Sequence, residues 1–436
     1  MPIIDTPWDS IPTPDITRNA IASGNWDNPA IWSPSGVPVA GDVVGIGLGG
    51  RWTVTFRDAD SVPVQIRVLS GGTLTLGTGT TWKLNISGVL VVEIGGQMYS
   101  AMQAYPSPPA DLRGTISFND TSFGSGDDTS SWLTTNTQYG NGLIVLGYVL
   151  LNTGQSIKTP SLRLKNNITT PVTSFELTGA HVRWEVGDKL VLPDSRIIAY
   201  PEDWQGEVVT ITGISINGSG NTVITLGTPT VYSHTGLNRL SGSNFRMPTV
   251  LNLTRRMVIR SAAGSTRRAH VLATTTKSLL NIRDIEFFEM GRTRWDIPLS
   301  PWQGPPDAEP IVPNQRGRYA LHLHHCGTTL DTTSGPILEG TGRGTGRVRG
   351  AIRGCSFWNE AVGIFVDPHP APQRTPTSKW PITIHDTRSM RIDRNVVYNA
   401  GGWGIGTEHR GERLEERSTD NRIEDNVICR VGCSQM

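Results

Sequence analysis

Four segments in the second half of the chain repeat one pattern, and this repeat restricts the fold more than any other feature. Asn395 and Asn426 occupy the same place in the last two copies, and Cys355 takes that place in an earlier copy. Each copy combines a short strand, a bend at a small or amide residue and a turn, which is the unit that stacks in a solenoid. We therefore expect the coils of a parallel β-helix, with amides hydrogen-bonded along its axis, rather than the strands of a sandwich. The copies are residues 282–292, 352–364, 391–405 and 422–436.

The rest of the chain carries strand signals and no sustained helix signal. Short apolar alternations such as TVTF (53–56), TLTL (73–76) and TVITL (222–226) recur, and glycine pairs separate several of them. Alternation with a period of two is typical of half-buried strands, and glycine supplies the turns between them. No window repeats apolar residues at the spacing of an amphipathic helix. The chain is therefore predicted to be all-β.

Composition and charge exclude several classes of protein. Charged residues are only 18% of the chain, which argues against a coiled coil or a highly charged disordered protein. No apolar run reaches the ~18 residues of a membrane-spanning helix, so no membrane span is expected. The net charge is −7 over residues 1–238 and +8 over residues 239–436, and 33 of the 39 basic residues are arginine. Because arginine pairs with carboxylate, sulfate and phosphate groups, the basic half either binds a polyanion other than nucleic acid or carries internal ion pairs.

The four cysteines all lie after residue 325, and no two are spaced as Cys-x-x-Cys. The spacing permits disulfides between Cys326 and Cys355 and between Cys429 and Cys433 but does not require them. We expect the first two to be buried free thiols. The first 20 residues contain no basic segment followed by an apolar one, so we expect that a secretory signal is absent or has been removed.

Changes in composition predict an arm and two insertions. Residues 1–25 are rich in proline, aspartate and threonine and are expected to form an extended N-terminal arm. Residues 295–316 and 367–381 are proline-rich and are expected to be insertions between coils. On a solenoid, insertions leave from one face and often build the binding site.

Several segments, in order along the chain, resemble one known family. The stretch 24–47 is similar to the start of the extracellular domain named for its eight glycines, with Trp32 followed by Gly36-Val37-Pro38 and Gly41-Asp42. The end of that domain and the segments after it in the cell-migration-inducing and transmembrane hyaluronidases have similar counterparts here. They are VVEIGGQMYSAMQAYP (91–106), HVRWEVGDKLVL (181–192), TVITLGTPTVYSHTG (222–236), NLTRRMVIRS (252–261), GRYALHLHHCG (317–327) and ITIHDTRSMRIDRNVVYNAGGWG (382–404).

This resemblance implies a fold, an activity and a location. It implies an eight-glycine-type β domain at residues 26–180, packed on a right-handed parallel β-helix at residues 181–436. It also implies binding or depolymerising of hyaluronan or a related acidic polysaccharide, outside the cell or at its surface. The chain departs from the family at Ala320, where the family has proline, and at Trp403, where the hyaluronidases have histidine.

The sequence LHLHHC contains the first candidate site residues. Strand alternation places His322 and His324 on one face and His325 on the other. The two same-face histidines could bind a metal together with a carboxylate from the next coil, or act as an acid/base pair near neutral pH. The alternative is that one of them is a buried histidine bonded to the backbone. Arg318 and Tyr319 precede them and are included in the candidate catalytic set.

Two further candidates come from later coils. His385 shares its strand face with Thr383 and Thr387, and we expect it to meet His322 or His324 across coils. Glu408 ends a later segment and is the candidate carboxylate, which the resemblance also retains.

Two reactions fit these residue types. In β-elimination, an arginine or a divalent cation such as calcium neutralises the uronate carboxylate, a histidine or tyrosine removes a proton, and an acid protonates the leaving oxygen. Hydrolysis instead needs two carboxylates at a defined separation, for which Glu408, Asp367 and Asp386 are the best candidates. We favour the His/Arg site, acting as a lyase or a glycosidase.

The alternative function is a β-helix without catalysis. Such a chain would be a surface adhesin, or a virion tail or fibre component, that binds glycans. A β-helix without a cap exposes strand edges, and no cap signal precedes Met436. A homo-oligomer, a capping partner or further chain is therefore expected at that end.

Overall fold

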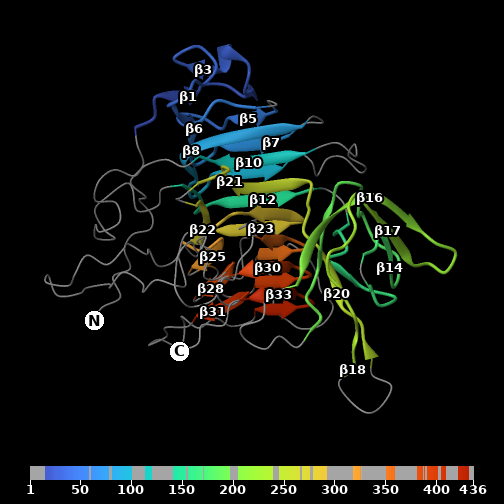
Figure 1. Cartoon of the computed structure of the whole chain (residues 1–436). Coiled ribbons are helices and arrows are strands. Elements are labelled where there is room, and N and C mark those ends of the chain that lie inside the picture. Colours follow the sequence, from blue (N-terminus) through green and yellow to red (C-terminus); the bar gives the residue numbers. More distant parts are fainter. Residues whose placement is uncertain are drawn as a thin grey trace, which may run out of the picture.

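The computed structural model describes most of the chain between residues 15 and 431. These residues form an all-β fold in which the one helical element is a single 3-10 turn, η1 (Pro29–Ile31). In Figure 1 the strands lie one above another along an elongated body, and a second group of strands stands beside it. The segments outside the described residues are 1–14, 58–59, 78–80, 101–112, 120–140, 154–155, 170, 197–204, 239–244, 266–267, 275–277, 292–317, 325, 327–349, 359–380, 386, 388–389, 401–403, 409–420 and 432–436.

Parallel strands build the elongated body, and they fall into stacks on the sides of a coil. From residue 257 onward the chain visits the second, first and third stacks in turn. The first stack contains β4 (Val43–Ile46), β6 (Val64–Val68), the second half of β8 (Trp82–Val92), β11 (Gly142–Val145), β22 (His270–Thr274), β25 (Leu321–His324), β28 (Ile382–His385) and β31 (Ile405–Glu408). The second contains the first half of β8, β10 (Gly114–Phe118), β21 (Met257–Ser261), β24 (Ile285–Phe288), β27 (Ser356–Trp358), β30 (Val396–Ala400) and β33 (Val427–Val431). The third contains β2 (Gly24–Asn25), β5 (Thr53–Phe56), β7 (Thr73–Leu76), β9 (Gln97–Ser100), β12 (Tyr148–Asn152), β23 (Leu279–Arg283), β26 (Gly350–Arg353), β29 (Met390–Asp393) and β32 (Arg422–Glu424).

The predicted all-β class and the coiled parallel arrangement are confirmed at this level, as a β-helix-like solenoid. Apolar side chains alternate along each strand, and the inward set from all stacks forms one continuous core. Inside it, residues at the same strand position lie directly above one another. Phe287 and Phe357, for example, stack with ring centroids 4.4 Å apart and planes 6° apart.

The bend between the third and second stacks carries the repeat detected in the sequence. Asn395 donates from Nδ2 to Oδ1 of Asn426 at 2.9 Å, and its own Oδ1 accepts the backbone N–H of Cys355 at 2.9 Å. The predicted ladder along the axis is therefore confirmed. The residue before each bend position has a positive φ: 56° at Asp284, 65° at Gly354, 55° at Arg394 and 55° at Asp425.

Glycine pairs make the tight corners between the first and third stacks. Gly71 has a φ of 83°, a conformation that glycine adopts without strain. A Cβ on Gly72 would lie 2.1 Å from the carbonyl oxygen of Ile46 on the preceding coil, so only glycine fits there. Gly95 and Gly96 repeat this arrangement one coil later, which explains the paired spacing.

Residues 161–252 form a lateral unit beside the solenoid (Figure 1). Every strand pairing in its six-stranded sheet is antiparallel. The unit has a separate apolar core that includes Trp184 and Ile211. Leu251 and Leu253 pack on Phe288 and Trp358, so the unit covers the outer surface of the second stack. Its elements are β13 (Ser161–Arg163), β14 (Ser174–Leu177), β15 (Lys189–Leu192), β16 (Glu207–Ile216), β17 (Thr222–Leu226) and β20 (Thr249–Asn252), with a small hairpin of β18 (Leu237–Asn238) and β19 (Phe245–Arg246).

The N-terminal end of the solenoid is closed by aromatic side chains. Trp26 meets Trp32 and Phe56 edge to face, and Phe56 meets Trp82 in the same way, so the rings continue the core upward. β1 (Arg18–Ala20) and β3 (Trp32–Ser33) pair antiparallel above the first parallel coil.

The remaining predictions from the sequence concern the cysteines, a membrane span, the domain boundaries, the arm and the insertions. Cys326 and Cys355 are buried free thiols, as expected, and burial raises the pKa of Cys355 to about 12. Among the described residues no helix has the length and apolar character needed to cross a membrane. The division at residues 26–180 and 181–436 stays a prediction; strands from both ranges share the parallel sheets. The arm at residues 1–25 is described only from residue 15, and the insertions at 295–316 and 367–381 lie outside the described residues except Pro381.

Candidate functional site

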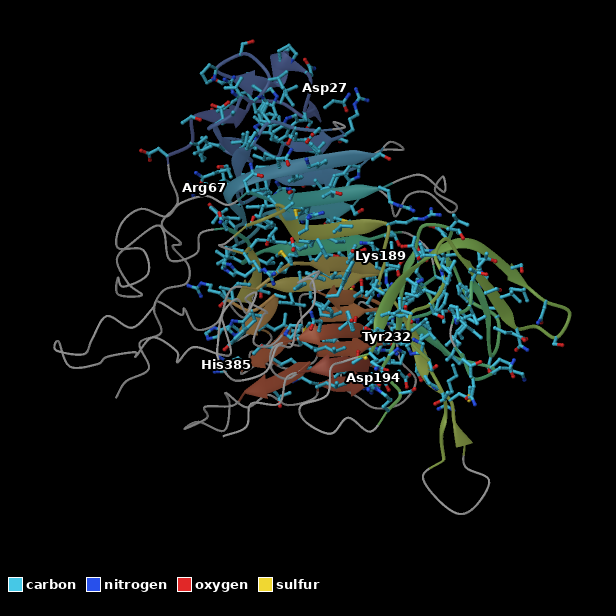
Figure 2. All side chains as sticks on the ribbon, in the orientation of Figure 1. Asp27, Arg67, Lys189, Asp194, Tyr232 and His385 are labelled. Atoms are coloured by element: carbon cyan, nitrogen blue, oxygen red, sulfur yellow. The ribbon has the colours of Figure 1, made fainter. Side chains whose placement is uncertain are left out.

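The predicted histidines lie on neighbouring strands of the first stack. In β25, Leu321 and Leu323 point into the core, so His322 and His324 share the outer surface. In β28, Ile382 and Ile384 point inward and leave Thr383 and His385 outside. Figure 2 shows His385 on the side of the solenoid away from Lys189 and Tyr232 of the lateral unit.

The three imidazole rings form one cluster. His324 lies directly beside His385 in the strand register, and their ring centroids are 4.7 Å apart. His322 and His324 are 5.2 Å apart, whereas His322 and His385 are 6.1 Å apart with nearly parallel planes. The predicted meeting of His385 with the other two across coils is therefore confirmed. His322 is buried, and the other two rings are half-buried.

Arg318 and Tyr319 lie immediately before β25 and are buried. The Tyr319 ring meets the His322 ring edge to face with centroids 5.1 Å apart, so it restricts how His322 can turn. Arg318 is only 4% exposed, and Tyr319 only 1%. The structure therefore places Tyr319 behind the cluster rather than at its outer surface.

Threonine hydroxyls border the imidazoles in the same strand rows. Thr383 lies beside His322 in the register, and Thr274 lies beside His324. Both side chains are fully buried, and within the described part of the chain neither hydroxyl oxygen has a hydrogen-bond partner. A buried hydroxyl without a partner costs free energy, so a polar group that turned toward either threonine would gain a hydrogen bond.

The surface becomes polar at the coil that carries the histidines. In the coils before it, the same outer row carries Val91, Ile144 and Leu272, which pack together as an apolar cluster. His322 and Thr383 continue that row. Along the chain, β25 lies between residues 292–317 and residues 327–349, which are both outside the described residues.

The remaining predicted residues are placed only in part. Glu408 pairs with His385 in the strand register, which puts its backbone in the row of His324 and His385. Its side chain lies outside the described residues, as do His325, Asp367 and Asp386.

The cluster can carry two kinds of chemistry. Imidazole titrates near neutral pH, so neighbouring rings can donate and accept protons in one reaction. Imidazole nitrogens also bind transition metals, whereas calcium prefers oxygen ligands. In the described ranges, no three histidine, cysteine, aspartate or glutamate side chains already converge as a metal site.

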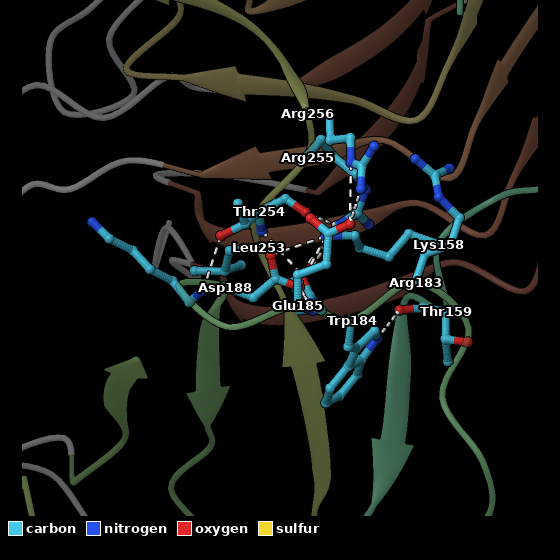
Figure 3. A network of polar contacts seen from close by, with 12 residues as sticks. Lys158, Thr159, Arg183, Trp184, Glu185, Asp188, Leu253, Thr254, Arg255 and Arg256 are labelled. Atoms are coloured by element: carbon cyan, nitrogen blue, oxygen red, sulfur yellow. Dashed lines mark hydrogen bonds and ion pairs between the residues drawn. The ribbon is translucent and has the colours of Figure 1, made fainter. Parts of the chain in front are cut away.

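A second polar cluster, which we call the charged seam, was not found by sequence reasoning. It joins the lateral unit to the solenoid, and Figure 3 shows most of its members. Lys158 donates from Nζ to both carboxylate oxygens of Asp188, at 2.9 and 2.8 Å, and both side chains are 1% exposed. Asp284, at the positive-φ bend, pairs with Arg183 at 2.6 Å and with Arg255 at 3.2 Å. The charged members are Lys158, Arg183, Arg255, Arg256, Glu185, Asp188, Asp284 and Glu286.

Uncharged residues of the motifs that carried the resemblance support the charged seam. Trp184 donates from Nε1 to the carbonyl of Thr159 at 2.7 Å, and Asn252 donates from Nδ2 to Asp188 at 2.8 Å. Burial lowers the pKa of Lys158, with the Asp188 carboxylate opposing that change. Because the charged seam is paired internally and covered, its contacts serve to dock the lateral unit.

No protein-family model matches the sequence, and no curated protein matches it.

Proposed function

We propose that the chain acts on a polysaccharide, binding and depolymerising an acidic glycan at the histidine cluster on the outer surface of β25 and β28. The observation that carries this proposal is the contact of His322, His324 and His385 on an outward-facing surface. Outward imidazoles add nothing to the apolar core, and two buried hydroxyls beside them lack partners within the described residues. A stacked parallel sheet also offers an extended surface to a polymer.

The geometry suggests different roles for the residues. His324 and His385 are the more accessible pair and are suited to transfer protons to and from the sugar. His322 is held by Tyr319 and orients the pair from behind. Glu408, in the same row, is the carboxylate candidate. Arg318, if it turns outward, would neutralise a uronate carboxylate, as the sequence predicts.

The resemblance to the hyaluronidases adds to this proposal. It supports hyaluronan or a related acidic glycan as substrate, a right-handed coil, an eight-glycine-type domain at residues 26–180 and a place outside the cell or at its surface. A glycan-binding surface protein or virion component without catalysis is the alternative outcome of the test.

The test is depolymerisation by the full chain. Hyaluronan, chondroitin sulfate and a neutral glycan are incubated with the protein, and polymer size and the ultraviolet absorbance of unsaturated uronate are followed. We expect the acidic polymers alone to shorten; new absorbance identifies a lyase and its absence a hydrolase. His324→Gln and His385→Gln should each reduce the rate about 100-fold or more, as for loss of a proton-transfer group. His181→Gln, in the lateral unit, is the matched control and should keep the parental rate. Intact polymers, or undiminished rates in the cluster variants, would overturn the proposal.

A further inference from the structure

The spacing of the three imidazoles matches a shared metal ion. Zinc binds histidine nitrogen at about 2.0 Å, so two rings on one tetrahedral ion have centroids about 5 Å apart. His324 is 4.7 Å from His385 and 5.2 Å from His322. The third pair, His322 and His385, is 6.1 Å apart, about 1 Å more than a tetrahedral ion allows, so these two rings must approach each other to share it.

The strand register provides this spacing through the backbone. Two ligands come from alternate residues of β25, and the third comes from the residue directly beside one of them on β28. Residues held by neighbouring parallel strands need only side-chain rotation to converge. Rotation is required, because His322 and His385 now stack with planes 5° apart and no set of three donors already converges among the described residues. His324 and His385 are half-buried, so their rings are less enclosed than the buried ring of His322.

Neighbouring side chains supply what such a site also needs. Histidine ligands of a metal usually bond a second polar group that fixes the ring. The Thr383 hydroxyl lies beside His322, and the Thr274 hydroxyl beside His324, both fully buried and without a partner in the described residues. Three nitrogen ligands leave a fourth position for water or substrate, as in catalytic zinc sites.

We infer that His322, His324 and His385 bind one transition-metal ion of the zinc class. This goes beyond the proposed function, since the ion is bound whether or not a glycan is cleaved. It favours zinc over calcium, the divalent cation considered from the sequence, because calcium selects oxygen ligands and imidazole selects zinc and its neighbours.

The test uses the full chain, purified without a polyhistidine tag and stripped with chelator. Zinc binding is measured by calorimetry, and cobalt binding by the visible absorption of four-coordinate cobalt. We expect one ion per chain, with calcium unable to displace cobalt. His385→Gln and His324→Gln should weaken binding about 100-fold or more, and Thr383→Val, which removes only the hydroxyl, about tenfold.

Controls separate a lost ligand from a lost fold. His181→Gln should bind zinc as the parent does, and circular dichroism should show the parental spectrum for every variant. If His322→Gln fails to fold, the half-buried His385 still decides the question. Absence of saturable binding, displacement of cobalt by calcium, or undiminished affinity in His385→Gln and His324→Gln would overturn the inference. The measurement contains no glycan, so inactivity toward polysaccharides leaves its outcome unchanged.

Discussion

Replacing Lys158 by methionine should loosen the lateral unit from the solenoid. Methionine keeps most of the length and volume of lysine but removes the ammonium group. Asp188 would then lose two hydrogen bonds of 2.9 and 2.8 Å at a position that is 1% exposed. It would keep the backbone N–H of Glu185 at 3.0 Å and the amide of Asn252 at 2.8 Å, which offset part of the loss.

The size of the effect follows from burial. Removing one partner of a buried ion pair costs about 3–5 kcal/mol, because the other charge remains buried. Lys158→Met combined with Asp188→Asn removes both charges and should recover at least about half of that cost. The matched control is Lys83→Met. Lys83 pairs with Asp60 at 3.2 Å, but these side chains are 42% and 64% exposed, so its loss should cost less than about 1 kcal/mol.

Hydrogen exchange read by mass spectrometry measures the effect where it occurs. A chain with separate cores does not unfold in one step, so local opening is more informative than a single midpoint. Since each 1.4 kcal/mol is a factor of ten, amides of β15 and β20 should exchange about 100-fold faster in Lys158→Met. Rates within a factor of ten of the parent, or a double variant as loose as the single one, would refute the reasoning.

Three further predictions concern buried groups. Burial raises the pKa of Glu286 from the ordinary 4.5 to about 7, so its stabilising contribution is complete below 4.5 and is lost as pH rises through 7. Glu286→Gln should remove about 3 kcal/mol of this pH dependence in unfolding experiments; equal slopes would contradict it. Asn395→Ala leaves the Cys355 N–H and the Ile352 carbonyl without their bonds and should cost about 2–4 kcal/mol in urea unfolding, whereas a cost below about 1 kcal/mol would exclude a structural ladder. Cys326 and Cys355 should react with a thiol reagent only after unfolding, because burial raises the pKa of both thiols; rapid labelling of the native chain would show otherwise.

Sequence reasoning succeeded where the signal was periodic. Asn395, Asn426 and Cys355 were placed at one bend because the repeat brings equivalent residues into register, and the hydrogen bonds along the axis confirm it. The shared face of His322 and His324 followed from strand alternation. Their contact with His385 followed from stacking coils, which turns a long separation in sequence into a lateral neighbour.

Sequence reasoning failed where partners have no period. Lys158 lies 30 residues before Asp188 and 126 before Asp284, and no pattern in the intervening sequence connects them. Arginine enrichment indicated either polyanion binding or internal ion pairs. In the described part of the basic half, Arg255 and Arg353 are buried partners of aspartate, so some of that charge is internal.

The two polar clusters differ in a way that separates structure from function. In the charged seam, basic and acidic side chains pair with one another, although Arg183 Nε and Arg255 Nη2 have no hydrogen-bond partner within the described residues. The histidine cluster instead joins imidazoles to Thr274 and Thr383 hydroxyls that lack partners within the described residues. A buried polar group that serves only the fold is normally satisfied by the fold. Loosening the lateral unit through Lys158→Met should therefore leave zinc affinity at the parental value, because the site depends on the register of β25 and β28. A parallel loss of zinc affinity would mean that the lateral unit helps to form the site.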